Sequence, residues 1–433
     1  MSMPWYGDLP ERWEACLVKN LFHIQKNIAG AEGYDVLSIT QRGIKVKNIE
    51  SNEGQMAQSY AKYQVVNIGD FAMNHMDLLT GWVDCAKVFG VTSPDYRVFV
   101  LDDKEQNADY LLIIMQLCYT RRIFYAYGRG AASEGRWRLP RKEFLNFSLP
   151  LPPRVEQDQI VRYLHWKVSR INKLIKAKRR QIELFGEFIT NKINNTLCYS
   201  TDKTTKVSKC VTKIGSGKTP RGGVTVYVDT GTLFIRSQNV YPSGLVTDNA
   251  YYITDEIDES MKGSRVFQGD VLLNITGGSI GRSCVYSFEG HANVNQHVCI
   301  IRPNQDILLP EYLAYFLNSP LGQTMINTSQ NEGNRQSLTF GQIGAFDIPL
   351  PQINEQEQLL HIIHGMDNPI KSVVGRLNEE IIFFIEYRNR LISDVVTGKL
   401  DVRGVAVPEY ETVEDDAGDA EIAGEYESDV TED

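Results

Sequence analysis

The chain has 433 residues, of which 42% are hydrophobic and 23% are charged, and its formal net charge is −9. This length and composition are typical of a globular protein with two or three domains, and they exclude a fibrous or largely disordered chain. Because no run of about eighteen apolar residues occurs and the N-terminus has no signal-peptide pattern, we expect neither a membrane span nor secretion. Seven scattered cysteines without a Cys-x-x-Cys pair fit the reduced thiols of a cytoplasmic protein.

The negative charge is concentrated at the C-terminus. After Arg403 the chain has no Lys or Arg, and twelve of the 54 acidic residues lie between Glu409 and Asp433. The remaining 42 acidic residues face 45 basic ones, so the body of the chain carries about +3. A polar, acidic segment buries too little apolar surface to fold, so residues 404–433 are predicted to be a disordered acidic tail. A body near neutrality binds nucleic acid only through local basic patches.

Residues 1–147 are predicted to form a first globular unit. They open with Trp5-Tyr6-Gly7-Asp8-Leu9-Pro10-Glu11-Arg12-Trp13, a pattern typical of a surface turn docked by aromatic side chains. Strand-like runs follow at Val36–Ile39, Tyr63–Ile68, Val83–Val91 and Tyr96–Val100. Asp109–Cys118 is apolar almost all round, which predicts a buried helix.

Residues 148–200 are predicted to form an extended entry and a long helix. The entry is Leu149-Pro150-Leu151-Pro152-Pro153, and the helix begins after it because proline cannot continue a helix backwards. Apolar residues then recur at three- and four-residue steps, as in the stripe of a coiled-coil helix. They are Ile160, Leu164, Ile171, Leu174, Ile175, Ile182, Phe185, Ile189 and Ile193.

Residues 201–347 are predicted to form a second globular unit that repeats the first. The pattern Val66-x-x-Gly69-Asp70-x-x-x-Asn74 recurs as Val266-x-x-Gly269-Asp270-x-x-x-Asn274, Tyr110-Leu111 recurs as Tyr312-Leu313, and Arg136-x-x-Leu139 recurs as Arg335-x-x-Leu338. Between these landmarks the two units differ widely. This is the pattern expected of two copies of one fold that bind different targets.

Residues 348–403 are predicted to form a second long helix. Pro349, Pro351 and Glu355-Gln356 follow Pro150, Pro152 and Glu156-Gln157 at a constant offset of 199 residues. The stripe includes Ile362, Ile363, Met366, Ile370, Val373, Val374, Leu377, Ile381, Phe384, Leu391 and Val395, and Pro369 predicts a kink or a break. Two helices of equal length can bury these stripes on each other as an antiparallel coiled coil. An ordinary helix pair inside one core is the alternative, and the constant offset favours a spacer between two units.

The proline-rich entry, the Glu-Gln pair and the long helix, present twice, resemble the specificity subunit of type I restriction–modification systems. The opening Trp5–Glu14 and the ending Leu391–Arg403 resemble it too, so the resemblance covers about residues 4–403. It implies an α+β fold with two similar mixed α/β target-recognition domains in tandem, each followed by a long helix. It also implies a bipartite double-stranded DNA target, two methyltransferase subunits and restriction subunits as partners, and no catalytic centre in this chain. S-adenosylmethionine, ATP and Mg²⁺ are implied only for those partner subunits.

Basic and amide residues in the two units are the candidate DNA contacts. Lys and Arg bind phosphates, whereas Arg, Asn and Gln also bind base edges. In the first unit the candidates are Arg121, Arg122, Arg129, Arg136 and Arg138, and in the second they are Lys218, Arg221, Arg236, Arg282, Asn295, Gln296 and Arg335. Taken singly, each is more often a solvated charge than a DNA contact. Substituting Arg136 or Arg335, which are equivalent in the repeat, is expected to weaken DNA binding.

Motifs for catalysis are incomplete. Gly215-Ser216-Gly217-Lys218-Thr219-Pro220 lacks the first glycine of a phosphate-binding loop, since position 212 is Thr, and Pro220 stands where the helix should start. Pro94-Asp95 and Asp102-Asp103-Lys104 match the text of a nuclease pattern, but Asp95 and Asp102 are separated by a strand that points them in opposite directions. His361-x-x-His364 lacks further metal ligands. No adenine-methylation loop occurs, and we predict no catalytic, cofactor-binding or metal-binding residue.

Two other functions remain open from the residues alone. One is a coiled-coil scaffold that binds proteins and not DNA. The other is the specificity part of a different multisubunit DNA methyltransferase. A fused methyltransferase or nuclease is disfavoured by the missing motifs. DNA binding measured across salt concentrations separates a DNA-binding subunit from a scaffold, because phosphate contacts give a steep salt dependence.

Overall fold

The computed structural model describes residues 4–48, 57–130, 137–198, 201, 203–220, 222, 226–248, 250–330 and 337–414. The chain divides into two compact units: unit 1 contains residues Met1–Arg179 and Leu377–Asp433, and unit 2 contains Arg180–Arg376. Helices α5 (Arg154–Cys198) and α10 (Ile353–Val396) each contribute to both units. Within the described ranges, no helix has the length and apolar character needed to span a bilayer.

Unit 1 is built on a four-stranded antiparallel sheet in the order β2-β9-β6-β7. Its globular elements are β1 (Glu14–Leu17), α1 (Val18–Leu21), β2 (Phe22–Gln25), β3 (Leu37–Thr40), β4 (Gly43–Val46), β5 (Gln64–Val66), β6 (Phe71–Met73), β7 (Val83–Cys85), β8 (Gly90–Thr92), β9 (Arg97–Leu101), α2 (Ala108–Thr120), α3 (Ile123–Ala126), β10 (Arg129–Gly130), β11 (Trp137–Arg138), α4 (Arg141–Leu145) and β12 (Ser148–Leu151). The run Val83–Val91, predicted as one strand, forms two. The reason is that β7 pairs with β6 in this sheet, whereas β8 pairs with β5.

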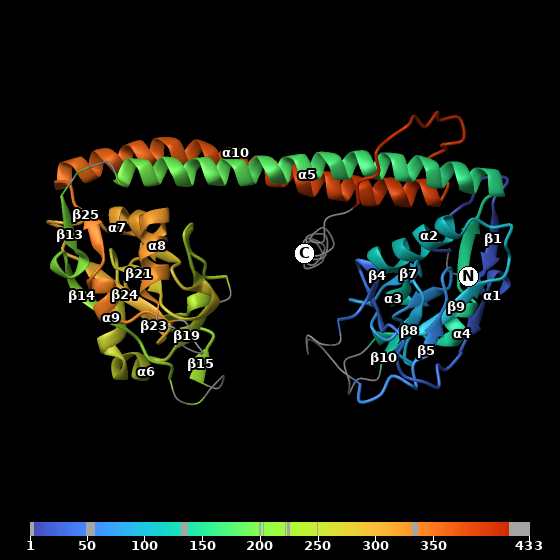
Figure 1. Cartoon of the computed structure of the whole chain (residues 1–433), viewed down its shortest axis with the longest axis horizontal. Helices are drawn as coiled ribbons and strands as arrows, with labels where there is room; N and C mark the ends of the chain where they lie inside the picture. Colours follow the sequence, from blue (N-terminus) through green and yellow to red (C-terminus); the bar gives the residue numbers. More distant parts are fainter. Residues whose placement is uncertain are drawn as a thin grey trace. The chain divides into compact units, whose positions relative to one another are not determined.

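Unit 2 contains the same kind of sheet, in the order β14-β24-β21-β22, and a second sheet in the order β15-β19-β16-β23-β20. Its elements, with η for a 3-10 helix, are β13 (Thr204–Lys206), η1 (Val207–Lys209), β14 (Val211–Ser216), β15 (Tyr227–Val228), β16 (Thr232–Ile235), η3 (Ser237–Asn239), β17 (Val240–Tyr241), β18 (Gly244–Leu245), β19 (Tyr251–Ile253), α6 (Asp255–Ser260), η4 (Lys262–Ser264), β20 (Arg265–Phe267), β21 (Val271–Asn274), η5 (Gly277–Ser279), β22 (Ser283–Val285), β23 (His291–Val294), β24 (Val298–Pro303), α7 (Pro310–Asn318), α8 (Pro320–Ser329), α9 (Phe340–Gly344) and β25 (Asp347–Pro349). Helix α7 lies between the first sheet and α10, because Phe316 shares one buried cluster with Leu273 and Ile363 (Figure 1).

The repeated tyrosine joins each unit to its proline-rich entry. The buried hydroxyl of Tyr110 donates to the carbonyl of Pro150 at 3.0 Å, and that of Tyr312 donates to the carbonyl of Pro349 at 3.0 Å. The entries themselves pair as antiparallel strands, β12 with β1 and β25 with β13. The duplication seen in the sequence is therefore a duplication of contacts.

The repeated Glu-Gln pair places a fully buried glutamine in the first turn of each long helix. Gln157 accepts from the backbone N–H of Asn107 and donates to the carbonyl of Pro152 and to Gln106. Gln356 makes the equivalent bonds in unit 2: it accepts from the N–H of Leu309 at 2.9 Å. Its amide donates to the carbonyls of Ile307 and Pro351 at 2.8 and 2.9 Å. Each glutamine thus joins its helix to the segment that leads into a helix of its own unit.

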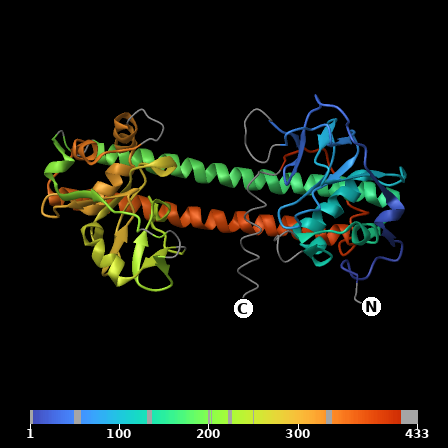
Figure 2. The same ribbon diagram turned by 90° about the horizontal axis from the view of Figure 1, so that it is seen from below.

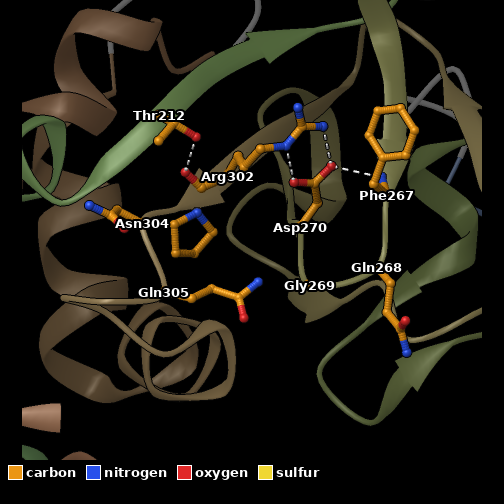
Figure 3. Close-up of a pocket in the computed structure, with 9 residues that line it drawn as sticks. Thr212, Phe267, Gln268, Gly269, Asp270, Arg302, Asn304 and Gln305 are labelled. Carbon is orange, nitrogen blue, oxygen red and sulfur yellow. Dashed lines mark hydrogen bonds and ion pairs between the residues drawn. The ribbon is translucent and has the colours of Figure 1, made fainter.

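The repeated Gly-Asp pair forms the turn before a central strand. Gly69 and Gly269 have φ values of 91° and 90°, a conformation that favours glycine. The buried carboxylate of Asp270 accepts the N–H of Phe267 and binds the guanidinium of Arg302 with two contacts of 2.7 Å (Figure 3). Asp270 and Arg302, which line the hollow beside this turn in Figure 3, are paired with each other, so the Gly-Asp motif belongs to the fold.

The two long helices pair in antiparallel orientation within unit 1. Asn172 on α5 accepts from Arg388 on α10 at 2.7 Å, and Lys178 contacts Glu380, so higher numbers on one helix face lower numbers on the other. Both views show the green α5 beside the red end of α10 (Figures 1 and 2). In unit 2, Leu197 of α5 belongs to the same buried cluster as Leu360 and Ile363 of α10.

Two positions of the predicted stripes are wrong. Leu174 and Ile362, expected in the paired stripes, are 48% and 51% exposed, because the neighbouring Ile175 and Ile363 occupy the buried positions. Of the kink or break predicted at Pro369, a break is absent, since α10 is continuous from Ile353 to Val396. Near that proline, buried Asp367 accepts from Tyr315 at 3.4 Å and contacts Lys371 at 2.6 Å, which anchors this turn to unit 2.

The first part of the predicted disordered tail is ordered on unit 1. Gln159 of α5 donates to the carbonyls of Val402 and Val405 at 3.0 and 2.7 Å, and Asn172 donates to that of Val413 at 3.0 Å. Ser169 accepts the N–H of Val413 at 3.3 Å. Polar side chains of α5 therefore satisfy the backbone of this segment, which corrects the prediction for residues 404–414. Residues 415–433 lie outside the described part of the chain.

Gly398 allows a test of the contact between the segment after α10 and the opening motif. It has a φ of +75°, and a Cβ there would lie 2.5 Å from Cγ of Pro10, in the opening motif. We expect Gly398→Ala to destabilise unit 1 by about 1–3 kcal/mol, through the left-handed conformation and the close approach. Thermal unfolding measures this. Gly404→Ala is the matched control, because nothing lies within 4 Å of its Cβ position; equal melting of both variants would contradict the contact.

Candidate nucleic-acid interface

Four strand ends of unit 2 meet at one edge. The N–H of Gly217, after β14, donates to the carbonyl of Asn295, after β23, at 3.2 Å. The N–H of Asn295 donates to the carbonyl of Ile235, at the end of β16, at 3.1 Å. Asn274, at the end of β21, donates its side-chain amide to the carbonyl of Ser237 at 2.7 Å. We call the segments that follow these strands the strand-end loops of unit 2.

A row of polar side chains runs along the strand-end loops. Thr219 donates to Gln296, the Gln296 amide contacts His297 at 3.1 Å, and His297 Nδ1 lies 2.5 Å from the Thr276 hydroxyl. Thr219 and Gln296 are exposed. The row therefore presents donors and acceptors of the kind that bind base edges, held in place by one another. Sequence reasoning found Gln296 and missed His297 and Thr276, because their bonds to each other are not local in sequence.

Asn295 is a correction among the candidate residues. Its side chain is only 6% exposed. Its side-chain oxygen accepts the N–H of His297 at 3.0 Å. The residue shapes the turn that positions Gln296 and is not available to a base edge through that oxygen. A buried polar group that closes a turn is the more common role for asparagine.

Lys218 is exposed and follows a glycine that a larger residue cannot replace. A Cβ at Gly217 would lie 1.6 Å from the carbonyl oxygen of Val294. In the Gly-x-Gly-Lys segment, strand β14 ends at Ser216 and a loop follows at residues 217–220. The segment is therefore not a phosphate-binding loop before a helix. Lys218 remains a candidate phosphate contact on the strand-end loops.

Arg236 and Arg282 are half-buried, and each lies against a tyrosine ring. The Cζ atom of Arg236 is 3.8 Å from the ring centroid of Tyr251, and that of Arg282 is 4.9 Å from the ring centroid of Tyr241. Sequence reasoning singled out both arginines but not their tyrosines. The sequence signal for these tyrosines is weak, since aromatic residues are common in strands.

In unit 1 the candidate arginines lie on a short hairpin and at a helix end. Arg129 and Arg138 stand directly opposite each other in the β10–β11 pair, and both are exposed. Like charges that lie directly opposite each other in a strand pair are destabilising. A bound anion would reduce the repulsion between these two arginines. Arg129 also contacts Glu143 at 2.9 Å. Arg121 and Arg122 are exposed at the end of α2, where Arg122 has a φ of 51°.

The positive charge of Arg138 contributes to a lowered pKa of a neighbouring histidine. Burial, together with the guanidinium groups of Arg97 and Arg138, lowers the pKa of His75 to about 3. His75 is therefore neutral at physiological pH and adds no positive charge to this part of unit 1.

Three of the twelve candidates, Arg136, Arg221 and Arg335, lie outside the described residues. Substitution of Arg136 or Arg335 stays a prediction on the sequence. The nuclease-like acids have other partners: Asp102 contacts His23 at 2.6 Å, and Asp103 caps the N–H of Glu105 at 3.0 Å. His364 contacts Glu311 at 3.4 Å. In the described part of the chain, no three His, Cys, Asp or Glu side chains are grouped to hold a metal ion.

Comparisons with known proteins point to one family. Residues 209–381 match the family model described as type I restriction modification DNA specificity domain. The EcoBI type I restriction enzyme specificity subunit of Escherichia coli is 31% identical over 133 residues, which are 29% of this chain and 28% of that protein. A putative type I restriction enzyme MjaX specificity subunit of Methanocaldococcus jannaschii is 27% identical over 136 residues, 30% of this chain and 31% of that protein.

These two matches span less than a third of either relative's length. A solved structure extends the likeness in fold. A chain from a study of complex assembly and conformational transition of the type I R-M system aligns with a TM-score of 0.65 at 13% sequence identity, covering 91% of this chain and 100% of that one. At this identity the comparison shows a shared fold.

Proposed function

The chain is a member of the specificity-subunit family of type I restriction–modification systems, and from this premise we propose that it is the DNA-recognition subunit of such a complex. The globular part of each unit binds one half-site of a bipartite double-stranded target. The paired helices set the distance between the half-sites and dock two methyltransferase subunits and the restriction subunits. The chain has no catalytic centre of its own in this proposal, and S-adenosylmethionine, ATP and Mg²⁺ belong to its partners.

One observation carries the proposal: a single scaffold occurs twice with different surface chemistry. The two units share the order of their central sheet, a tyrosine bonded to a proline carbonyl and a buried docking glutamine. Their candidate surfaces differ, with a hairpin carrying opposed arginines in unit 1 and polar strand-end loops with arginine–tyrosine pairs in unit 2. Two equal scaffolds with unequal surfaces suit a target made of two different half-sites.

Exposed apolar side chains on the long helices support the docking part of the proposal. Phe383 and Tyr387 on α10 are 62% and 47% exposed and stack on each other. Leu184 and Phe188 on α5 are 47% and 51% exposed. Large apolar groups left in water along a helix pair are typical of surfaces that bind other proteins. The helices therefore suit a role as the attachment site for partner subunits.

Salt-dependent DNA binding tests the proposal. We expect the purified full chain to bind duplex DNA, with an affinity that falls steeply as salt rises. Arg129→Ala and Arg138→Ala, which remove opposed charges on the β10–β11 hairpin, should each weaken binding to all sequences and reduce the salt slope by about one. A gel-shift titration at several salt concentrations measures both quantities.

The control variant is Lys173→Ala, which removes an exposed positive charge from α5 and should leave the slope unchanged. Melting curves establish that the arginine variants remain folded. A wild-type chain that binds DNA weakly and without a salt slope would favour the protein-binding scaffold instead.

A further inference from the structure

The arginines of unit 2 divide into two classes by their partners. Four arginines are described between residues 201 and 352. Arg265 binds the buried carboxylate of Asp258, and Arg302 binds that of Asp270, so both are committed to the fold. Arg236 and Arg282 have no ion pair with any described residue, and each is placed against a tyrosine ring instead.

The position of Arg236 is costly for the free protein. Its Nε atom is buried and has no hydrogen-bond partner among the described residues. A buried donor without a partner is uncommon in folded proteins, so this arginine is not placed there to stabilise the fold. The stack is also well supported: the Tyr251 ring lies 4.3 Å from that of Tyr227 with an interplanar angle of 15°. The guanidinium is therefore held as a flat group on a fixed aromatic surface.

Both arginines belong to the same edge of unit 2. The fully buried Asn274 donates its side-chain amide to the carbonyl of Ser237, which follows Arg236, at 2.7 Å. Its backbone N–H donates to the carbonyl of Arg282 at 2.9 Å. One asparagine thus fixes the backbone beside both arginines, and this edge also carries the polar row that contains Gln296.

We propose that Arg236 and Arg282 each bind a guanine in the half-site recognised by unit 2. This inference rests on the proposed function and specifies its chemistry. A guanidinium held in one plane presents two parallel N–H donors, which match the O6 and N7 acceptors of guanine in the major groove. A tyrosine ring under the guanidinium reduces its freedom before binding, so less entropy is lost when the two hydrogen bonds form. Gln296 then binds a neighbouring position of the same half-site.

The alternative role for these arginines is a phosphate contact, and lysine separates the two. A phosphate binds the positive charge of lysine as it binds that of arginine. Lysine, however, cannot supply the two fixed hydrogen-bond donors of a guanidinium. Arg236→Lys and Arg282→Lys should each therefore relax the preference for guanine at one position, by roughly 5- to 150-fold, and leave the rest of the site unchanged. A phosphate contact predicts an unchanged motif with a nearly unchanged affinity.

The experiment is selection from randomised duplex DNA by the purified full-length chain, followed by sequencing. The wild type should enrich a bipartite motif with two guanine–cytosine pairs in one half. Each lysine variant should lose one of them, and the other half-site serves as an internal control. Lys262→Ala, which removes an exposed charge of unit 2 that is paired locally with Glu259, should retain the whole motif. Tyr251→Phe keeps the ring and should also retain it.

A second measurement uses the wild-type chain and does not depend on the folding of a variant. Replacing each guanine of the selected half-site with 7-deazaguanine removes the N7 acceptor. Affinity should fall at two positions, and the fall at one of them should disappear in Arg236→Lys. If no guanine position responds, or if both lysine variants keep the wild-type motif, the assignment is wrong while the proposed function stands. If the wild type enriches no motif at all, the proposed function itself fails.

Discussion

Replacing Gln356 with alanine is expected to destabilise unit 2 by about 1–3 kcal/mol, because its fully buried amide bonds three backbone groups and an unsatisfied buried group costs about that much. These groups are the N–H of Leu309 and the carbonyls of Ile307 and Pro351. Since they join the start of α10 to the segment before α7, the loss loosens the helix from its unit. Thermal or denaturant unfolding of the full chain measures the effect.

The matched control is Gln358→Ala, two residues further along the same helix, where the side chain is exposed. It should change stability by less than about 0.5 kcal/mol. The equivalent change in unit 1, Gln157→Ala, should lower the stability of that unit instead, because its bonds repeat those of Gln356. Similar melting of Gln356→Ala and Gln358→Ala would show that the buried amide does not hold the helix in place.

Lengthening both long helices together is expected to widen the gap between half-sites by about three base pairs. Seven residues add about 10.5 Å of helix, and DNA rises about 3.4 Å per base pair. Suitable positions are after Arg179 in α5 and after Glu379 in α10, because the contact between Lys178 and Glu380 then stays within unit 1. A heptad nearly preserves the facing stripes, since an ideal helix drifts only about 20° per seven residues.

The measurement is a genome-wide map of methylated sites in cells that carry the lengthened chain and its methyltransferase partner. The half-site sequences should be unchanged while their spacing grows. An insertion after the end of α5 is less suitable, because Leu197 is packed in the core of unit 2. Seven residues added to α5 alone should destabilise the pair and serve as the mismatched control. Unchanged spacing with two folded, lengthened helices would show that the helix pair does not set the distance.

The repeat, the two long helices and their starting points were predictable because the forces behind them are local. Proline fixes the entry, and a helix can begin only after it, so α5 starts at Arg154 and α10 at Ile353. The 3.6-residue spacing of apolar side chains predicted the paired stripes. The constant offset of 199 residues between the two copies indicates two equivalent units. These features determine the fold class and point to the family.

Tertiary structure decided which candidate residues are available for binding. Arg265, Arg282 and Arg302 are equally basic in the sequence, yet only Arg282 lacks a carboxylate partner among the described residues. Asn295 looked like a base contact and instead closes a turn. The same holds for residues 404–414, whose acidic composition predicted disorder until α5 supplied partners for their backbone. A residue's partner comes from a segment that is distant in sequence, so local patterns identify the charge but only the folded chain determines whether that charge is satisfied inside the protein or presented at its surface.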